Sequence, residues 1–286
     1  MVAKKKNPPK RHRGKYNPEN SLPYEIARGK IEDFVKCKAC FWLDRKAGVK
    51  PPEIPSFTLN TTTDILLKRD ADSVRGKKAL PLWEAHGLGH LIPFEHPDLE
   101  NWTKSKQFGQ DGFFNTDHKK TNLRVGGGLD DVFLNTRTGK IHIVDYKSTA
   151  QGTNSPEKYE KKAVSLDDPW KVSYKRQMDI YVWVMRQKGF DVSPTGYFVY
   201  VDAQHKDIEG MLLDSNNSKR ALMEFETSII PYKTSTAWIE KTLVEIKDFL
   251  ENQDECPEHT PAIKGVKYSG CDLGRYANQM MRALGK

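Results

Sequence analysis

Residues 127–147 read GGLDDVFLNTRTGKIHIVDYK, and this stretch decides the fold. Two largely apolar runs, 129–134 and 140–147, flank the polar segment 135–139, which ends in Gly139. Short apolar runs on either side of a polar, glycine-containing segment are typical of a β-hairpin. We therefore predict two antiparallel strands joined by a turn.

The predicted hairpin places two carboxylates side by side. If the turn is centred between Arg137 and Thr138, Asp130 lies opposite Asp145. Lys147 shares the face of Asp145, because side chains alternate along a strand. Two apposed carboxylates repel each other unless a cation lies between them, and Mg²⁺ or Mn²⁺ prefers oxygen ligands. The pattern therefore indicates a divalent-metal site.

Two alternatives stay open for this acidic hairpin. A register shift of one residue puts Asp131, in place of Asp130, in the pair. The charged residues can also form a solvent-facing salt-bridge group, which is the usual arrangement of surface charges. The apolar run that leads into Asp145 argues against the second alternative, because it is typical of a buried strand.

The remaining chain mixes helical and extended patterns, which predicts a central mixed sheet flanked by helices, in the α/β class. Amphipathic patterns predict helices over 21–46, 61–75, 173–188 and 236–250. Further strands are expected over 196–201 and 210–213, and short strands and loops between 79 and 125.

Composition restricts the class of protein. The chain has 286 residues, of which 37% are hydrophobic and 29% charged, as in a water-soluble protein with a core. No run approaches the about 18 apolar residues of a membrane helix. Pro8 and Pro9 follow the basic amino terminus where a secretion signal needs apolar residues. We expect a cytoplasmic protein that does not associate with membranes.

Nearly all of the net charge of +8 comes from residues 1–15, which contain Lys and Arg but no acid. Such a tail binds polyanions by releasing counterions from phosphates, but tails of this kind also serve solubility or localisation. The tail alone therefore does not establish nucleic-acid binding.

Three short motifs occur together in one order. Residues 127–130 (GGLD) fit G-x-x-D, residues 144–147 (VDYK) fit D-x-K, and Gln177 and Tyr181 fit Q-x-x-x-Y on one helix face. This combination resembles the PD-(D/E)xK nuclease superfamily and, within it, the RecB-like branch, which includes CRISPR-adaptation and AddB-type nucleases. The resemblance implies a restriction-endonuclease-like fold.

The resemblance also implies a metal-dependent nuclease that hydrolyses DNA, as an exodeoxyribonuclease or DNA-processing enzyme. Asp130 and Asp145 would hold Mg²⁺ or Mn²⁺, and Lys147 would orient a water or offset charge on phosphorus. Gln177 and Tyr181 would help to place DNA or the lysine. DNA is the implied partner, and relatives work with a helicase or a DNA-processing complex.

The chain departs from the RecB-like branch at an upstream G-x-x-x-H, whose histidine helps to hold the metal. Asn60 and Asp64 occupy the two positions here. Because hard cations accept carboxylate oxygen, Asp64 is expected as a third metal ligand. Asp64 can equally be a solvated residue in the first turn of its helix.

The four cysteines fall into two terminal groups. Cys37 and Cys40 form C-x-x-C, while Cys256 and Cys271 lie near the other end. RecB-like relatives often join their ends through a four-iron four-sulfur cluster, so the resemblance implies such a cluster, with a structural zinc as the alternative. Relatives usually have one early and three late cysteines, and Gly274 stands where a last cysteine is expected. The cysteines can instead be buried apolar residues that bind nothing.

The expected organisation is a disordered basic tail over residues 1–20 and one nuclease domain over 21–286. Its terminal segments meet if the cysteines share a metal. Cationic residues at the start of the helix over 173–188 can contact the DNA backbone or simply be solvated: Lys171, Lys175 and Arg176. Two other functions stay open, a nucleic-acid-binding module without catalysis and a structural scaffold.

Overall fold

The computed structural model describes residues 11–50, 52, 57–151, 163–205, 208–212, 219–266 and 269–285. The chain divides into two compact units, each formed from separate stretches of sequence. The terminal unit comprises residues 1–53, 104–128 and 236–286, and the sheet unit comprises residues 54–103 and 129–235. Each unit is described by itself.

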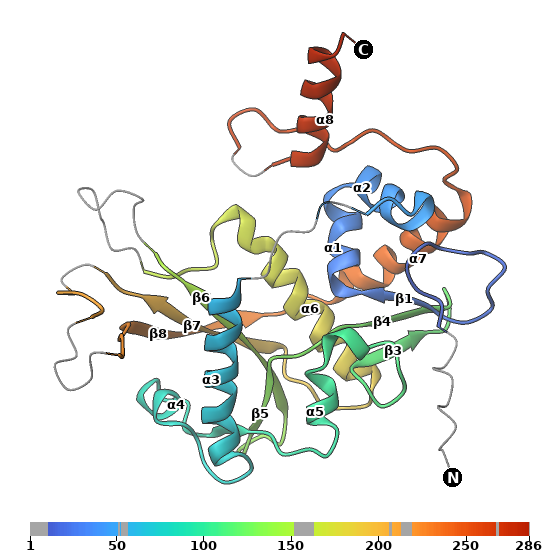
Figure 1. The fold of residues 1–286 in the computed structure, drawn as a ribbon. Helices are drawn as coiled ribbons and strands as arrows, with labels where there is room; N and C mark the ends of the chain where they lie inside the picture. Colours follow the sequence, from blue (N-terminus) through green and yellow to red (C-terminus); the bar gives the residue numbers. More distant parts are fainter. Residues whose placement is uncertain are drawn as a thin grey trace, which may run out of the picture. The chain divides into compact units, whose positions relative to one another are not determined.

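The sheet unit is built on a five-stranded mixed sheet in the order β2-β5-β6-β7-β8 (Figure 1). β6 and β7 are parallel, and the other neighbouring pairs are antiparallel. The strands are β2 (Leu91–Pro93), β5 (Asp131–Asn135), β6 (Ile141–Thr149), β7 (Thr195–Ala203) and β8 (Phe225–Lys233). The expected α/β fold with a central mixed sheet is confirmed.

Helices lie on both faces of β6. α6 (Val172–Gln187) connects β6 to the parallel strand β7, as a parallel pair requires, and packs on the face of β6 that carries Asp145. α3 (Thr58–Val74) packs on the opposite face, where Thr63 is hydrogen-bonded to Ser148. Two short helices complete the unit, α4 (Pro81–Ala85) and α5 (Leu99–Trp102).

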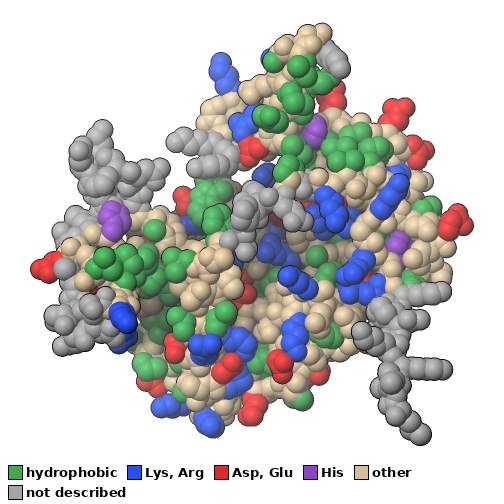
Figure 2. Space-filling model, in the orientation of Figure 1, with side chains coloured by type: hydrophobic (Ala, Val, Ile, Leu, Met, Phe, Trp, Pro, Cys, Tyr) green, Lys and Arg blue, Asp and Glu red, His purple; other side chains and the backbone are tan. Residues whose placement is uncertain are grey.

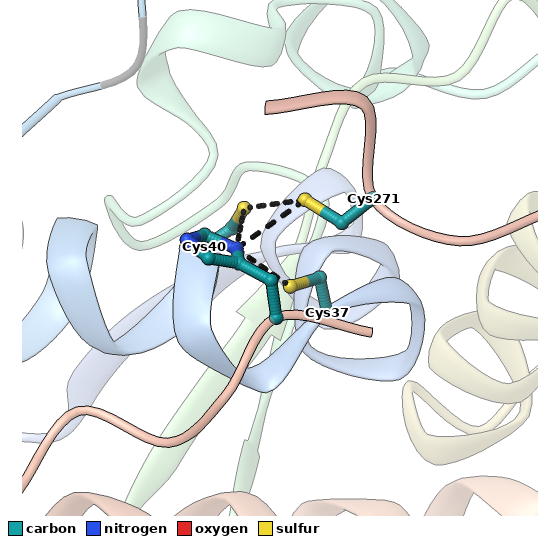
Figure 3. Close-up of side chains that lie close together, drawn as sticks. Cys37, Cys40 and Cys271 are labelled. Atoms are coloured by element: carbon teal, nitrogen blue, oxygen red, sulfur yellow. Dashed lines mark hydrogen bonds between the residues drawn. The ribbon is translucent and has the colours of Figure 1, made fainter. Parts of the chain in front are cut away.

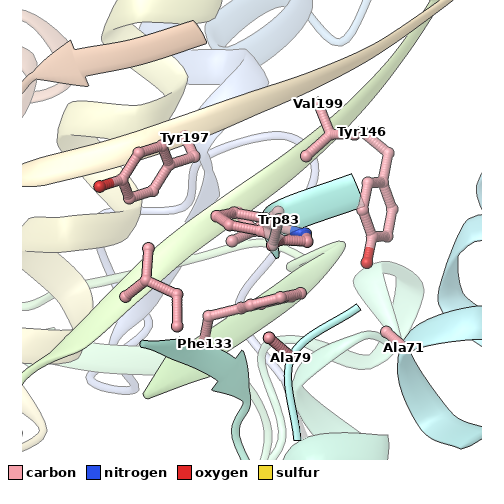
Figure 4. Packing of buried hydrophobic residues seen from close by; sticks show 9 residues of the cluster. Ala71, Ala79, Trp83, Phe133, Tyr146, Tyr197 and Val199 are labelled. Carbon is pink, nitrogen blue, oxygen red and sulfur yellow. The ribbon is translucent and has the colours of Figure 1, made fainter. Parts of the chain in front are cut away.

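Aromatic side chains form the core beneath α3 and α4 (Figure 4). The Trp83 ring stacks on Phe133, with ring centroids 4.4 Å apart, and meets the edge of Tyr197 at 5.3 Å. Ala71 and Tyr146 extend the same cluster. This packing fixes the position of β6 and therefore of the charged residues on its other face.

The turn of the β5–β6 hairpin has the predicted centre. Asn135 N donates a hydrogen bond to Lys140 O at 2.9 Å, which closes the loop. Asn135 Oδ1 accepts hydrogen bonds from the backbone N–H groups of Arg137 and Thr138. Gly139 has a φ of 72°, a conformation that a residue without a side chain adopts readily. Local turn chemistry thus sets the register of the two strands.

The terminal unit contains a three-stranded sheet in the order β1-β4-β3 and several helices. Its core includes Phe34, Phe41 and Phe249, whose rings meet edge to face. The strands are β1 (Tyr24–Ala27), β3 (Asn115–His118) and β4 (Leu123–Gly126); the helices are α1 (Arg28–Lys36), α2 (Lys38–Trp42), a π-helical turn (Leu43–Ala47), α7 (Ala237–Asn252) and α8 (Asp272–Ala283).

Some expected elements differ from the structure. The helix expected over 21–46 starts with strand β1 and is divided into shorter helices. The strand expected over 210–213 is absent from its described residues, 210–212, and residue 213 lies outside the described residues. β8 and α8 were not predicted. β8 contains Pro231 and is largely exposed at the sheet edge, so it lacks a buried alternation.

The ordered chain begins before residue 21. His12 and Tyr16 are 4% and 8% exposed and pack with Tyr24 of β1. Residues 11–20 were expected to belong to a disordered tail, but they are ordered. Residues 1–10 lie outside the described residues. Among the described residues, we found no helix with the length and apolar character needed to cross a membrane.

Replacement of Trp83 by Ala tests the core of the sheet unit. Removing this ring, which is 1% exposed, is expected to lower the free energy of unfolding by about 3–5 kcal/mol in urea denaturation. The control Leu59→Ala truncates a side chain that is 57% exposed and should change it by less than about 0.5 kcal/mol. Equal stability of the two variants would contradict this packing.

Candidate active site

The carboxylates of Asp130 and Asp145 lie opposite each other at the end of the β5–β6 hairpin. β5 pairs with β6 so that Asp131 faces Val144. Continuing this register by one residue places Asp130, which precedes β5, opposite Asp145. Asp130 Oδ2 also accepts a hydrogen bond from Tyr146 N at 2.8 Å. The arrangement is the one predicted from the turn.

Asp145 is enclosed, with 1% of its surface exposed. Its Oδ1 accepts a hydrogen bond of 2.6 Å from Gln177 Nε2 on α6. Its Oδ2 forms an ion pair with Lys147 Nζ but accepts no hydrogen bond of ordinary geometry from any residue that the structure describes. A buried carboxylate oxygen without a full set of partners is costly and calls for a further donor or a cation.

Asp130 shares this environment. Burial and then the charge of Asp145 raise the pKa of Asp130 well above its usual range. The charge of Lys147 and the hydrogen bond from Tyr146 N oppose this rise. Two carboxylates this close do not both ionise readily unless more positive charge is supplied.

Lys147 is the cation that faces these acids. Its side chain is 15% exposed, and its Nζ lies 4.8 Å from the centroid of the Tyr174 ring. Burial alone would lower the pKa of Lys147, but the carboxylates of Asp145 and Asp130 outweigh burial and raise it. The side chain therefore supplies a fixed positive charge and hydrogen-bond donors next to the carboxylate pair.

Asp64 approaches the same group from α3. Burial raises the pKa of Asp64 to about 6, the charge of Lys147 lowers it, and the charge of Asp145 raises it. The hydrogen bond between Thr63 and Ser148 holds this part of α3 to the end of β6. The expected third carboxylate is thus close enough to interact electrostatically with the other two.

Gln177 and Tyr181 lie one turn apart on α6 and are 6% and 3% exposed. Gln177 contacts the Asp145 carboxylate directly, so it orients that acid. Tyr181 is buried on the same helix. The Q-x-x-x-Y motif therefore belongs to the inward side of α6.

Asp131 has a different environment from Asp130. It is fully buried, and its two oxygens accept hydrogen bonds of 2.9 Å from the two terminal nitrogens of Arg75. Tyr146 Oη donates a further hydrogen bond of 2.9 Å. This ion pair satisfies the carboxylate on the face opposite Asp145, which excludes the one-residue register shift. Arg75 carries no local motif, so the sequence did not identify it.

Lys171, one of the cations considered for contact with DNA, is not accessible for that role. Lys171 is fully buried, and its Nζ donates to Ser165 O at 2.6 Å and pairs with Asp168 at 2.8 Å. The ammonium also lies 5.5 Å from the centroid of the Tyr200 ring. Lys171 is therefore a structural residue, whereas Lys175 and Arg176 are partly exposed.

This group of residues fits a hard divalent cation. Among the residues that the structure describes, the carboxylates of Asp64, Asp130 and Asp145 all interact electrostatically with the ammonium group of Lys147, so acids outnumber the cation in this group. Oxygen donors of this kind are the ligands that Mg²⁺ and Mn²⁺ prefer. The incompletely satisfied Oδ2 of Asp145 is a buried donor atom available to such an ion.

A second cluster lies in the terminal unit (Figure 3). One ligand atom from each of Cys37, Cys40, His259 and Cys271 lies within 4.8 Å of the others. Cys256 was expected as a ligand, but it is exposed and lies outside this group. His259 supplies the fourth ligand atom instead. His259 was not predicted as a ligand, because only cysteines were considered. The spacing Cys256-x-x-His259, which repeats that of Cys37-x-x-Cys40, is the signal that could have indicated it.

Replacement of Arg75 by Met tests the role of Asp131. It leaves a buried carboxylate without its cation, and the free energy of unfolding should fall by about 3–5 kcal/mol in urea denaturation. Arg69→Met on the exposed side of α3 is the control and should have little effect. Adding Asp131→Asn to Arg75→Met should restore part of the stability. No difference between Arg75→Met and Arg69→Met would exclude this pair as a stabilising contact.

Comparison with known proteins identifies the family. The family model described as the PD-(D/E)XK nuclease superfamily matches residues 69–263, about two thirds of the chain. The matched range contains the five residues expected to be catalytic, but not Asp64. Searches of curated proteins and of solved structures each gave no match. With its mixed sheet and the carboxylate pair on its central hairpin, the chain belongs to the PD-(D/E)XK nuclease superfamily.

Proposed function

We propose that the protein is a metal-dependent nuclease that hydrolyses phosphodiester bonds of DNA. The observation that carries this proposal is the environment of Asp145. One of its oxygens is held by Gln177, and the other faces Lys147 without an ordinary hydrogen bond. Asp130 lies directly opposite. A purely structural carboxylate would have both oxygens satisfied, as Asp131 does.

Asp130 and Asp145 are the residues proposed to hold Mg²⁺ or Mn²⁺, with Asp64 as a third ligand. When bound, such an ion offsets negative charge on the scissile phosphate and lowers the pKa of a water molecule. Gln177 donates to Asp145 Oδ1, which fixes the plane of the carboxylate and leaves Oδ2 directed towards Lys147. The carboxylates are thus oriented before any substrate arrives.

Lys147 is proposed as the catalytic lysine. Its ammonium group stays protonated beside the two acids and can donate to a water or to a phosphate oxygen as negative charge develops there. The Tyr174 ring beside Nζ restricts its position. Tyr181 is proposed to support the inner side of α6, so that Gln177 keeps its contact with Asp145.

Within the nuclease class, we propose an exodeoxyribonuclease or DNA-processing enzyme that works with a helicase or a similar complex. The support is the combination of G-x-x-D, D-x-K and Q-x-x-x-Y, which resembles the RecB-like branch. The partly exposed Lys175 and Arg176 at the start of α6 are suited to contact the phosphate backbone.

Cleavage assays with labelled linear single- and double-stranded DNA test the proposal. The wild-type protein should cut in Mn²⁺ or Mg²⁺ and not in EDTA. Asp145→Ala and Lys147→Met should each lower the rate by at least about 10²-fold, since each removes a group that acts on the developing charge. Lys140→Met, which changes an exposed lysine of the same hairpin, is the matched control and should cut at the wild-type rate.

Closed circular DNA and RNA of the same sequence distinguish the finer parts of the proposal. An exodeoxyribonuclease should leave both intact. Undiminished, metal-dependent cleavage by folded Asp145→Ala protein would disprove the proposed site. Salt-sensitive DNA binding without cleavage under any of these ions would favour the non-catalytic binding module.

Gln177→Ala tests the positioning of Asp145. A hydrogen bond to a charged group contributes about 1.5–3 kcal/mol, so kcat should fall by about 10- to 100-fold. The concentration of Mn²⁺ required for half-maximal activity should rise, because the ligand is no longer oriented. Gln187→Ala, an exposed position at the other end of α6, is the control. An unchanged metal requirement for Gln177→Ala would contradict a positioning role.

A further inference from the structure

The four ligand atoms of the cysteine-histidine group lie close enough together to surround one ion. His259 Nδ1 lies 3.4 Å from the Sγ atoms of Cys37 and Cys271 and 3.6 Å from that of Cys40. The Sγ atoms of Cys40 and Cys271 are 3.3 Å apart (Figure 3). A tetrahedral zinc ion with bonds of about 2.3 Å to sulfur and about 2.0 Å to nitrogen places a sulfur and a nitrogen about 3.5 Å apart and two sulfurs about 3.8 Å apart. The three sulfur–nitrogen distances therefore match one such ion, while the sulfurs of Cys40 and Cys271 lie somewhat closer together than the ion would hold them.

A four-iron four-sulfur cluster does not fit the same group. The cluster places four iron atoms and four sulfides between its ligands, so the ligand atoms must stand far apart. Here all four ligand atoms lie within 4.8 Å of one another. One ligand is an imidazole, whereas such clusters are ordinarily held by four thiolates. Three thiolates and one histidine are a common ligand set of structural zinc.

Gly274 explains why the fourth ligand is not the expected late cysteine. A Cβ atom at this position would lie 2.4 Å from the Cβ of His259, so a side chain there would displace the histidine. Gly274 N also donates a hydrogen bond to Cys271 Sγ at 3.3 Å. The expected pattern has a cysteine at position 274. Here the glycine at this position leaves the room that the His259 side chain occupies.

Among the described residues, two hydrogen bonds and an exposed ion pair between Lys46 and Asp254 join the segment that supplies His259 and Cys271 to α1, α2 and the turn that follows. Residues 253–271 contain no helix or strand within the described positions, and most of those side chains are exposed. Thr260 Oγ1 donates to Lys36 O at 2.9 Å, and Trp42 Nε1 donates to Gln253 O at 3.0 Å. These hydrogen bonds are too few to offset the loss of conformational entropy on ordering such a segment.

The apolar packing of α8 is limited to its first turn, where Leu273 contacts the cluster around the cysteines. Gly274 is its one buried residue. Green, hydrophobic atoms lie at the surface over α8 in Figure 2. The large apolar side chains of α8 that are exposed are Tyr276, Met280 and Met281. Cys271 caps the amino end of the helix and lies in a small cluster with Cys37, Ala39 and Leu273. The contact between α8 and the rest of the terminal unit is therefore concentrated at the cysteines.

An ion can reach this group from outside. A hollow of about 190 Å³ is lined by Cys37, Cys40 and Cys271 together with acidic residues that include Asp33 and Asp44. Asp33 and Asp44 are both ion-paired with Lys30, so the hollow provides access to the cysteines rather than an excess of negative charge. Access, ligand type and ligand spacing thus all suit a single soft divalent ion.

We infer that Cys37, Cys40, His259 and Cys271 bind one structural zinc ion, in place of the iron–sulfur cluster that the family resemblance implies. The ion joins the C-x-x-C at the start of α2 to residues more than 200 positions later in the chain. Closing a loop of this length costs conformational entropy, which zinc binding offsets in the folded terminal unit. The inference does not depend on the proposed nuclease activity.

Metal analysis of the full chain tests the inference. Protein purified without oxygen and without added metal should contain one zinc per chain and no iron or acid-labile sulfide. Replacement of zinc by Co²⁺ should give the visible absorption of a tetrahedral thiolate site. His259→Ala and Cys271→Ser should lose the zinc, whereas Cys256→Ser, which changes the cysteine outside the group, should keep it. His259→Cys should also keep it, since four thiolates bind zinc.

Thermal unfolding provides a second measurement on the wild-type protein, which does not require the variants to fold. A strong chelator should lower Tm, and added zinc should restore it. The chelator should leave the Tm of folded His259→Ala unchanged. Iron with labile sulfide in the wild-type protein would overturn the inference, as would four titratable free thiols and no uptake of zinc.

Discussion

The electrostatic repulsion between Asp130 and Asp145 is the constraint around which the sheet unit is arranged. The β5–β6 hairpin forces the two acids together, and burial makes their repulsion costly. Lys147 supplies positive charge, while Gln177 on α6 orients one acid. The aromatic core on the other face of β6 holds the strand in place, so the acids cannot move apart. This charge arrangement costs stability, which supports the proposed role of these residues in catalysis.

Strand alternation gives two consecutive aspartates opposite roles. Asp131 points to the α3 face, where Arg75 and Tyr146 satisfy its oxygens. Asp130 points to the α6 face and meets Asp145 instead. Along β6, Tyr146 lies between Asp145 and Lys147 and points to the opposite face. The α3 face of this strand therefore contributes to folding, and the α6 face carries the proposed site. The stability of the sheet unit and its chemistry therefore depend on the same few residues of one hairpin.

Local signals in the sequence were sufficient for the hairpin and for α6, and they failed where long-range contacts decide the structure. The polar turn at 135–139 and the spacing of Gln177 and Tyr181 have direct physical meaning for a strand pair and a helix face. Arg75 and His259 acquire their roles only when distant segments meet, so no spacing pattern around them was decisive. α8 escaped prediction because it has no apolar face buried in a core.

The sequences of the two units are completed at different times during synthesis of the chain. The sheet unit is complete in sequence once residue 235 has been synthesised, so it can fold while the rest of the chain is still on the ribosome. The terminal unit begins with the first residues but also needs residues 236–286. For the inferred zinc site to form, Cys37 and Cys40 must stay reduced until His259 and Cys271 have been synthesised.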